Sequence, residues 1–232
     1  MGRAETLARA ATLDRPAVAY LHRFPGAGGW HEYALTWDQL DRTTTWVASR
    51  LAALGLERGH RAVLTFSGYE GPWAHPVMDA VRRLGVVYGT AEPAGWDHGR
   101  VRVLQRQLAV TGLVGLSLET VEALAEHAPP GELFATTPVL LVRPEAVGPL
   151  RSAGVDAGTL AFVGPALGIE CRERAGVHVD GASWRLDDDG GRPVIGGAAG
   201  GPALAPATLA LDGAVVTGPC ACGSTDPRLV LR

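Results

Sequence analysis

Residues 36–66 read TWDQLDRTTTWVASRLAALGLERGHRAVLTF and contain one complete helix–turn–strand unit. Thr36 and Gln39 have the spacing of a capping box, which predicts a helix that begins directly after Thr36. Apolar side chains then recur at helical spacing until Gly55, a residue type that commonly ends helices. The residues from 61 to 66 read as a buried strand. This stretch therefore predicts a helix packed on a sheet.

The same alternation of helix and strand patterns continues along the chain to about residue 163. Such alternation with short connections is typical of a doubly wound sheet whose strands run mostly parallel. We therefore predict an α/β fold with flanking helices. The predicted helices cover 36–54, 76–84, 99–108, 117–127 and 144–151, and the predicted strands cover 17–21, 61–66, 86–88, 110–115, 139–142 and 159–163.

The character of the sequence changes after about residue 168. Short strand patterns, glycine pairs and an Asp-Asp-Asp-Gly hairpin signal at 187–190 replace the helical patterns. We therefore predict two parts: an α/β domain over residues 1–167 and a small β subdomain over residues 168–232.

All three cysteines of the chain lie in this C-terminal part. Three thiolates and one imidazole are a common tetrahedral ligand set for structural zinc. The alternative is that the thiols are buried core residues that hold no ion, and the Cys-x-Cys spacing is tighter than the usual ligand spacing. The candidate metal ligands are Cys171, His178, Cys220 and Cys222.

The composition argues against several classes of function. A formal net charge of -3 over 232 residues gives no reason to expect a nucleic-acid partner. No apolar run has the length of a membrane span, and the N-terminus lacks a signal-peptide pattern, so we expect a cytoplasmic protein without membrane contacts. All 21 basic residues are arginine. The chain therefore contains neither a Schiff-base lysine nor a Walker-A lysine.

Several segments resemble a known enzyme superfamily. Residues 34–40, 54–64 and 81–88 resemble the opening of adenylate-forming enzymes, the acyl-CoA synthetase superfamily. Two later segments, ECRERAGVH at 170–178 and PCACG at 219–223, look like the phenylacetate–CoA ligase branch. In that branch the Glu-Cys, Gly-x-His and Cys-x-Cys-Gly elements recur around a β subdomain. The resemblance therefore implies a ligase fold, and it favours the zinc site because all four candidate ligands fall in one subdomain.

The chain departs from this superfamily at the elements that activate a carboxylate. Residues 112–160 contain no phosphate loop that ends in lysine. Residues 161–162 are Ala-Phe where the resemblance implies a Thr-Glu pair for ATP and magnesium, and residues 204–209 lack the acid that holds ribose. The C-terminal domain with a second catalytic lysine is also missing from these 232 residues. Since adenylyl transfer depends on positioned cations and phosphate-binding donors, we predict a relative without this activity.

A weaker signal for ligand binding follows the strand at 61–66. A hydroxyl, a carboxylate and an imidazole come at its carboxyl end, where open α/β sheets bind ligands, although such turns are also polar for local hydrogen bonding. Four aromatic residues could line an acyl or aryl pocket or pack as ordinary core or rim residues: Trp30, Trp73, Tyr88 and Trp96. The candidate ligand-binding residues are Ser67, Tyr69, His75, Tyr88 and Trp96, and no residue is assigned a catalytic role.

Two functions are consistent with these patterns. The first is a catalytically degenerate acyl-CoA synthetase-like protein that binds a small acyl or aryl carboxylate or a protein partner. Apolar surface left by the lost segments would favour a homodimer or a complex with another protein. The second is an enzyme with altered chemistry that acts on an acyl, adenylate or thioester intermediate.

Overall fold

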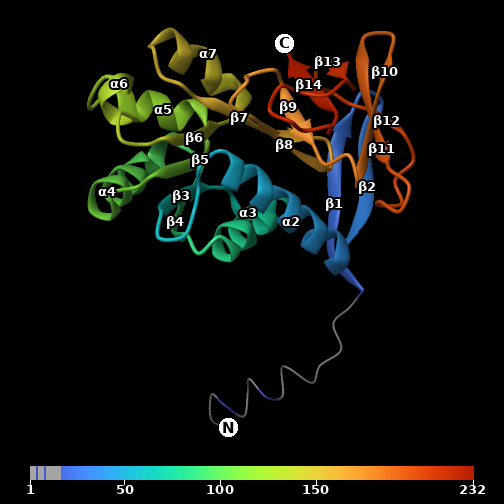
Figure 1. Ribbon diagram of the computed structural model, residues 1–232, viewed down its shortest axis with the longest axis horizontal. Coiled ribbons are helices and arrows are strands. Elements are labelled where there is room, and N and C mark those ends of the chain that lie inside the picture. The colour runs from blue at the N-terminus through green and yellow to red at the C-terminus, as the bar shows by residue number, and fades with distance from the viewer. Residues whose placement is uncertain (1–3, 5–7, 9–16) are drawn as a thin grey trace.

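The computed structural model describes residues 4, 8 and 17–232 (Figure 1). Within these residues the largest sheet has nine strands in the order β13-β14-β9-β8-β7-β6-β5-β3-β4. Its strands are β3 (Arg61–Thr65), β4 (Val87–Ala91), β5 (Gly112–Leu116), β6 (Val139–Val142), β7 (Gly158–Val163), β8 (Ala166–Glu170), β9 (Val177–Val179), β13 (Gly213–Val216) and β14 (Arg228–Leu231). The α-helices are α2 (Trp37–Ala53), α3 (Gly71–Arg83), α4 (His98–Leu108), α5 (Leu118–Ala125), α6 (Pro130–Leu133) and α7 (Pro144–Ser152).

The large sheet is parallel in one half and antiparallel in the other. Strands β4, β3, β5, β6 and β7 are parallel neighbours, as the alternating pattern predicts. The pairs β7–β8, β8–β9, β9–β14 and β14–β13 are antiparallel. The prediction of a mostly parallel sheet is therefore correct only as far as β7. The connections from β7 to β8 and from β8 to β9 are too short for a crossover helix, so these strands pair antiparallel.

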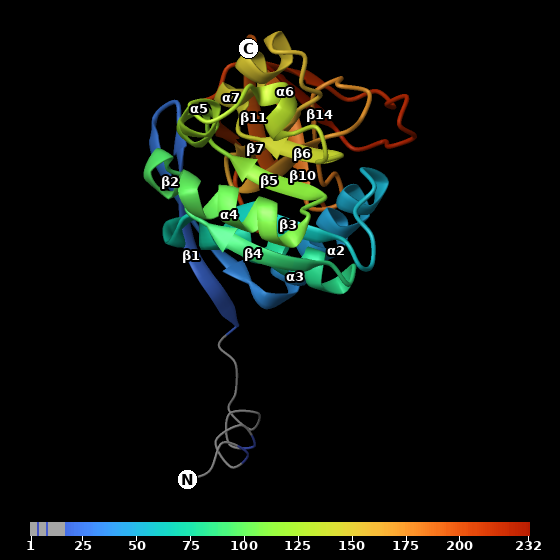
Figure 2. The same cartoon turned by 90° about the vertical axis from the view of Figure 1, so that its left-hand side faces the viewer.

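Helices cover both faces of the parallel half (Figures 1 and 2). Side chains of one strand alternate between the two faces, so neighbouring residues of β3 enter different cores. Leu64 packs in a core with Leu51 of α2 and Val77 of α3. Val63 packs in another core with Val101 of α4. This arrangement leaves the ends of the parallel strands as the part of the sheet that a ligand can reach.

A hairpin from the start of the described chain packs against strands from its C-terminal part. The hairpin consists of β1 (Val18–Gly26) and β2 (Gly29–Thr36), and the small sheet beside it consists of β10 (Trp184–Asp189), β11 (Arg192–Gly197) and β12 (Ala207–Thr208) (Figure 1). The N–H of Ala27 donates to the carbonyl of Thr208 at 2.9 Å. Phe24, Tyr33 and Trp184 belong to the core between them. Segments far apart in sequence therefore share a third core.

Helix α2 begins where the capping box predicts. The hydroxyl of Thr36 accepts from the N–H of Gln39 at 3.3 Å, and the Gln39 side chain accepts from the N–H of Thr36 at 2.8 Å. Gly55 follows the helix with a φ of 100°, a conformation that favours glycine. None of the described helices combines the length and the apolar character that a membrane span needs.

We expect Thr36→Ala to lower the free energy of unfolding by about 1 kcal/mol, because the backbone N–H of Gln39 loses the hydroxyl that accepts its hydrogen bond. Urea unfolding monitored by circular dichroism measures the change. The matched control is Thr43→Ala, whose hydroxyl bonds only to the Gln39 carbonyl inside the same helix. This control should be neutral or slightly stabilising, since alanine has the higher helix propensity. Equal losses in the two variants would contradict the prediction.

Candidate functional site

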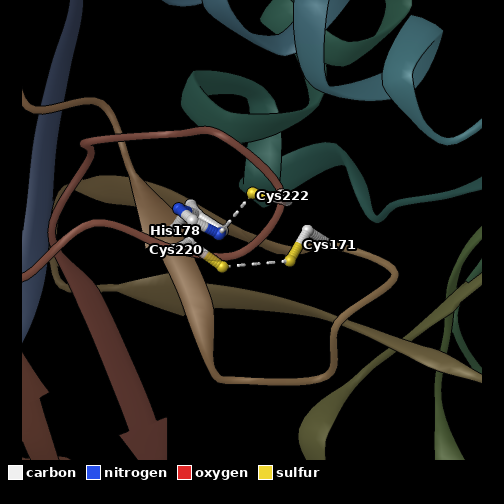
Figure 3. Close-up of side chains that lie close together, drawn as sticks. All are labelled: Cys171, His178, Cys220 and Cys222. Carbon is white, nitrogen blue, oxygen red and sulfur yellow. Dashed lines mark hydrogen bonds between the residues drawn. The ribbon is translucent and has the colours of Figure 1, made fainter.

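The four predicted metal ligands lie together beside the antiparallel half of the large sheet (Figure 3). One follows β8, one lies on β9, and two lie in the connection between β13 and β14. Their ligand atoms all lie within 4.8 Å of one another. We refer to this group as the Cys3His cluster; its members are Cys171, His178, Cys220 and Cys222.

The spacing within the Cys3His cluster fits a tetrahedral ion. The sulfurs of Cys171 and Cys220 are 3.8 Å apart, and the sulfur of Cys222 is 3.6 Å from Nε2 of His178. Two thiolates at zinc–sulfur distance and a tetrahedral angle lie about 3.8 Å apart, and a thiolate and an imidazole about 3.6 Å apart. The cluster could therefore hold a metal without a large rearrangement. The alternative of three unrelated core thiols does not explain this convergence.

The protonation of the cluster agrees with a metal-binding role for two of its members. Burial lowers the pKa of His178, and the neighbouring Arg50 lowers it further, which favours the neutral imidazole that binds metals. Burial raises the pKa of Cys220, but the N–H of Cys222 and the other thiols lower it by more. Burial raises the pKa of Cys171 to about 11, so an ion must displace that proton on binding.

Polar contacts connect the cluster to helix α2. The carboxylate of Asp226 accepts from the indole N–H of Trp46 at 2.9 Å and from the backbone N–H of Gly181 at 3.2 Å. Arg172, next to the first cysteine, donates to the carbonyl of Leu54 at 2.7 Å. These bonds hold the two cysteine-bearing segments against the end of α2. The cluster therefore joins the strands of the antiparallel half to the first helix of the fold.

A cavity of about 570 Å³ lies at the carboxyl ends of the parallel strands. The order β4-β3-β5-β6 means that the chain reverses its direction of winding between β3 and β5, the position where open α/β sheets bind ligands. We call this cavity the carboxyl-edge pocket. It is lined by Tyr69, Glu70, Pro93, Ser117, Leu118, Glu119, Arg143, Pro144, Glu145, Phe162 and Leu211.

A buried arginine lines the carboxyl-edge pocket. The guanidinium of Arg143 donates to the carboxylate of Glu70 at 2.9 Å and to the carbonyl of Gly115 at 3.1 Å. Its centre lies 4.1 Å from the ring of Phe162 and 5.1 Å from that of Phe66. Burial lowers the pKa of Arg143, and the charge of Glu70 opposes this shift. The bond to Glu70 therefore holds the guanidinium of Arg143 against the ring of Phe162, which gives the pocket a surface that is both aromatic and cationic.

The aromatic stack continues from the pocket into the third core. Phe162 stacks on Trp73 with ring centres 4.2 Å apart, and the ring of His22 meets Trp73 edge-on at 4.2 Å. His22 is buried, and its Nε2 has no hydrogen-bond partner within the described chain. Burial lowers the pKa of His22 to about 4. A protonated imidazole is therefore disfavoured in the folded state.

This burial predicts an acid-sensitive stability. Unfolded histidine titrates near pH 6.5 and folded His22 near pH 4, so the unfolded state binds the proton first as the pH falls. We expect this contribution, at most about 3 kcal/mol, to be fully present above pH 6.5 and lost progressively toward pH 4. Urea unfolding from pH 7 to pH 4 should show a shallower loss for His22→Phe than for the unaltered protein. Parallel curves for the two proteins would contradict this.

The five predicted ligand-binding residues do not share one cavity in the described chain. Of these five, Tyr69 alone lines the carboxyl-edge pocket. Ser67 is buried directly after β3, and Trp96 is 76% exposed. His75 lines a different cavity beside α2, and Tyr88 lies on β4 with the guanidinium of Arg82 over its ring. Residues near in sequence are separated here because α3 turns His75 toward the hairpin.

Two residues of the pocket, Arg143 and Phe162, were not predicted from the sequence as ligand contacts. Arg143 directly follows the apolar strand β6, and a charged residue at the carboxyl end of a parallel strand was the available signal. Phe162 belongs to the Ala-Phe pair that stands where the resemblance implies a Thr-Glu pair, so no role of its own was predicted for it. Nothing local indicates that its ring stacks on the guanidinium of Arg143, since Phe162 lies on β7 and Arg143 follows β6.

Comparison with known proteins finds similarity in fold and not in sequence. No protein-family model and no curated protein matches the chain. An open conformation of 2-hydroxyisobutyryl-CoA ligase, in complex with 2-HIB-AMP and CoA, superposes over 97% of the chain with a TM-score of 0.64 and 14% sequence identity. ATP-bound MatB from Rhodopseudomonas palustris superposes over 81% of the chain with a TM-score of 0.55 and 14% identity.

The fold is similar to that of acyl-CoA ligases. The chain spans 60% of the length of the 2-hydroxyisobutyryl-CoA ligase chain and 41% of the MatB chain. An RpMatB–BxBclM chimera bound to ATP gives a TM-score of 0.59 at 13% identity, again over 41% of its length. The ligase fold expected from the sequence resemblance is therefore confirmed. Identities this low carry the fold alone, so they do not test the phenylacetate–CoA ligase branch.

Proposed function

We propose that this protein is a catalytically degenerate, phenylacetate–CoA ligase-like protein that binds a small acyl or aryl carboxylate. The observation that carries this proposal is the carboxyl-edge pocket, in which Arg143 lies against Phe162 at the switch point of the sheet. A carboxylate would pair with the guanidinium, and its acyl or aryl part would pack on Phe162 and Leu118. In this reading the protein acts by binding alone.

The charges of the pocket disfavour ATP as the ligand. Three carboxylates, those of Glu70, Glu119 and Glu145, line the pocket with one arginine. Because Glu70 already pairs with Arg143, a triphosphate would meet uncompensated negative charge. The sequence also contains no lysine that could contact phosphates. A ligand with a single negative charge and a large apolar part would meet less of this repulsion than a triphosphate.

We further propose that the Cys3His cluster holds zinc in a structural role. Four protein ligands leave no open position for a substrate, which is the arrangement of structural zinc sites. Thiolate-rich sets favour zinc over magnesium, calcium and manganese. The reduced thiols that such a site needs also agree with a cytoplasmic location.

Ligand-observed NMR with a panel of acyl and aryl carboxylates tests the binding proposal. We expect at least one panel member to bind, and to bind about three- to tenfold more weakly to Tyr69→Ala and Phe162→Leu, which remove aromatic contacts from the pocket. The matched control is Trp30→Ala, an exposed aromatic residue on β2 outside the pocket. Equal binding by all four proteins would contradict the proposed pocket, and no binding at millimolar ligand would contradict the proposed ligand class.

An enzyme with altered chemistry is the second candidate, and one arrangement favours it. The hydroxyl of Tyr20 lies 3.1 Å from Nδ1 of His75, whose Nε2 lies 3.0 Å from the carboxylate of Asp79. A hydroxyl, an imidazole and a carboxylate in series are the parts of a nucleophile with its general base. Hydrolysis of acyl thioesters that is lost in both Tyr20→Phe and His75→Gln would support this function. Unchanged hydrolysis in either variant would contradict it.

We also propose a homodimer or a protein partner as the working assembly. Leu21 is 86% exposed and Trp30 is 62% exposed, and both belong to the hairpin of β1 and β2. Exposed apolar side chains grouped on one element favour association. Light scattering coupled to size-exclusion chromatography should give a dimer mass for the unaltered protein and a smaller mass for Leu21→Ser with Trp30→Ser. A monomer mass for both proteins would contradict the homodimer, and a complex with a different protein would then be the remaining proposal.

A further inference from the structure

Two histidines from different elements meet at the surface beside the carboxyl-edge pocket. His98 is the first residue of α4, and His127 follows the end of α5. Their Nε2 atoms are 3.1 Å apart, and their rings are nearly parallel with centres 5.3 Å apart. Helices α4 and α5 pack against each other, so the two rings are brought together by the fold. Neither residue has a role in the functions considered above.

The hydrogen bonding of His98 leaves Nε2 free to accept. Its Nδ1 lies 2.7 Å from the carbonyl oxygen of Gly95, which can only accept a hydrogen bond. The proton of a neutral His98 ring therefore sits on Nδ1, and the lone pair sits on Nε2, facing His127. A metal-bound histidine almost always donates its other ring N–H in this way, commonly to a backbone carbonyl. The bond to Gly95 thus supplies the outer contact of a metal ligand.

We infer that His98 and His127 form a second metal site, which binds a divalent transition metal that prefers imidazole. Two imidazole nitrogens at about 2.0–2.1 Å from one ion, at an angle between octahedral and tetrahedral, lie about 3 Å apart. The observed 3.1 Å agrees with this spacing. Because the ring centres are 5.3 Å apart, the two nitrogens point at each other, so each ring must turn about its side-chain bonds for both lone pairs to face one ion. On binding, His127 would carry its one ring proton on Nδ1 instead of Nε2, so that the Nε2 lone pairs of both neutral imidazoles are available to the ion.

The surroundings determine the type of ion and its coordination. Imidazole suits copper, nickel and zinc, and affinity for such a site rises to a maximum at copper. His98 is half-buried and His127 is exposed, so water can fill the remaining positions. The turn that holds His98 also touches the pocket, because the N–H of Gly95 faces the carboxylate of Glu119 at 3.5 Å. The site is therefore open, unlike the Cys3His cluster, and lies next to the proposed ligand.

Nickel titration of the zinc-loaded protein tests this inference. A single equivalent of zinc goes first to the four-ligand Cys3His cluster and occupies the thiolates, so the nickel added afterwards reports on imidazole sites. We expect one equivalent of Ni²⁺ to bind at least about tenfold more tightly to the unaltered protein than to His98→Gln or His127→Gln, because the second imidazole binds intramolecularly. Amide NMR signals near residues 95–98 and 124–128 should broaden selectively. Circular dichroism establishes that each variant is folded before titration.

The matched control is His60→Gln, which removes another imidazole, one that forms an ion pair with Glu57. This variant should bind Ni²⁺ like the unaltered protein. Affinities within about twofold for all three single variants would overturn the inference, since two chelating ligands cannot be lost without a larger effect. Broadening centred on any other histidine would overturn it as well.

Discussion

Cys220→Ser should remove the bound zinc and lower the free energy of unfolding by several kcal/mol. The proposed ion would join the segment after β8, strand β9 and the connection between β13 and β14, whose cysteines form no disulfide. An ion present at a thousandfold excess over its dissociation constant stabilises a folded protein by about 4 kcal/mol. Elemental analysis and urea unfolding of the variant measure the two effects.

A chelator gives the matched control for this prediction. Removal of zinc from the unaltered protein should lower its stability to about that of Cys220→Ser, and the chelator should leave the variant unchanged. Because Cys220 is buried, serine could also destabilise the core without any ion. A native protein that contains no zinc, or a chelator that destabilises neither protein, would contradict the structural role.

Glu70→Ala should cost about 3–5 kcal/mol of stability, the second large effect expected here. The substitution leaves the buried guanidinium of Arg143 without its carboxylate partner. Two backbone carbonyls, those of Thr65 and Gly115, still accept from it, but they do not neutralise its charge. Urea unfolding monitored by fluorescence measures the loss.

The double variant Glu70→Ala with Arg143→Met distinguishes two causes of the lost stability: the unpaired buried charge of Arg143, and the loss of its interaction with Glu70. Since the unpaired charge is the main cost, the double variant should recover much of the loss. The matched control is Asp41→Ala, which breaks the exposed ion pair with Arg83 and should cost less than about 1 kcal/mol. A loss of stability in Glu70→Ala as small as that in the control would contradict the prediction that the unpaired charge of Arg143 is costly.

Local signals in the sequence predict the parts of the fold that depend on neighbouring residues. The capping box at Thr36 and Gln39 forms as predicted, and Ser117 caps α5 by accepting from the N–H of Thr120. The parallel order also follows from the spacing of helices and strands. The pairing of β14 with β9 joins residues about fifty positions apart, and no local pattern specifies it.

The two candidate sites differ in how much the sequence reveals. Cysteine and histidine are rare residue types, so their grouping in one subdomain, together with the ligase resemblance, predicted the Cys3His cluster although the Cys-x-Cys spacing is tighter than usual. The carboxyl-edge pocket depends on Glu70 and Arg143, which lie 73 positions apart. Charged and aromatic residues are common, and only the packed sheet shows which of them meet. The separation of His75 from Tyr69 follows from the same tertiary arrangement.

The measurement that tests the central proposal most directly is adenylation by the zinc-loaded protein. The protein is mixed with ATP, magnesium, CoA and the carboxylate panel, and release of AMP and pyrophosphate is followed beside an active acyl-CoA ligase. A binding protein without phosphate-contacting lysines should release no more AMP than the protein-free control, although it binds a carboxylate of the panel. Reproducible, carboxylate-dependent release of AMP and pyrophosphate would contradict the account.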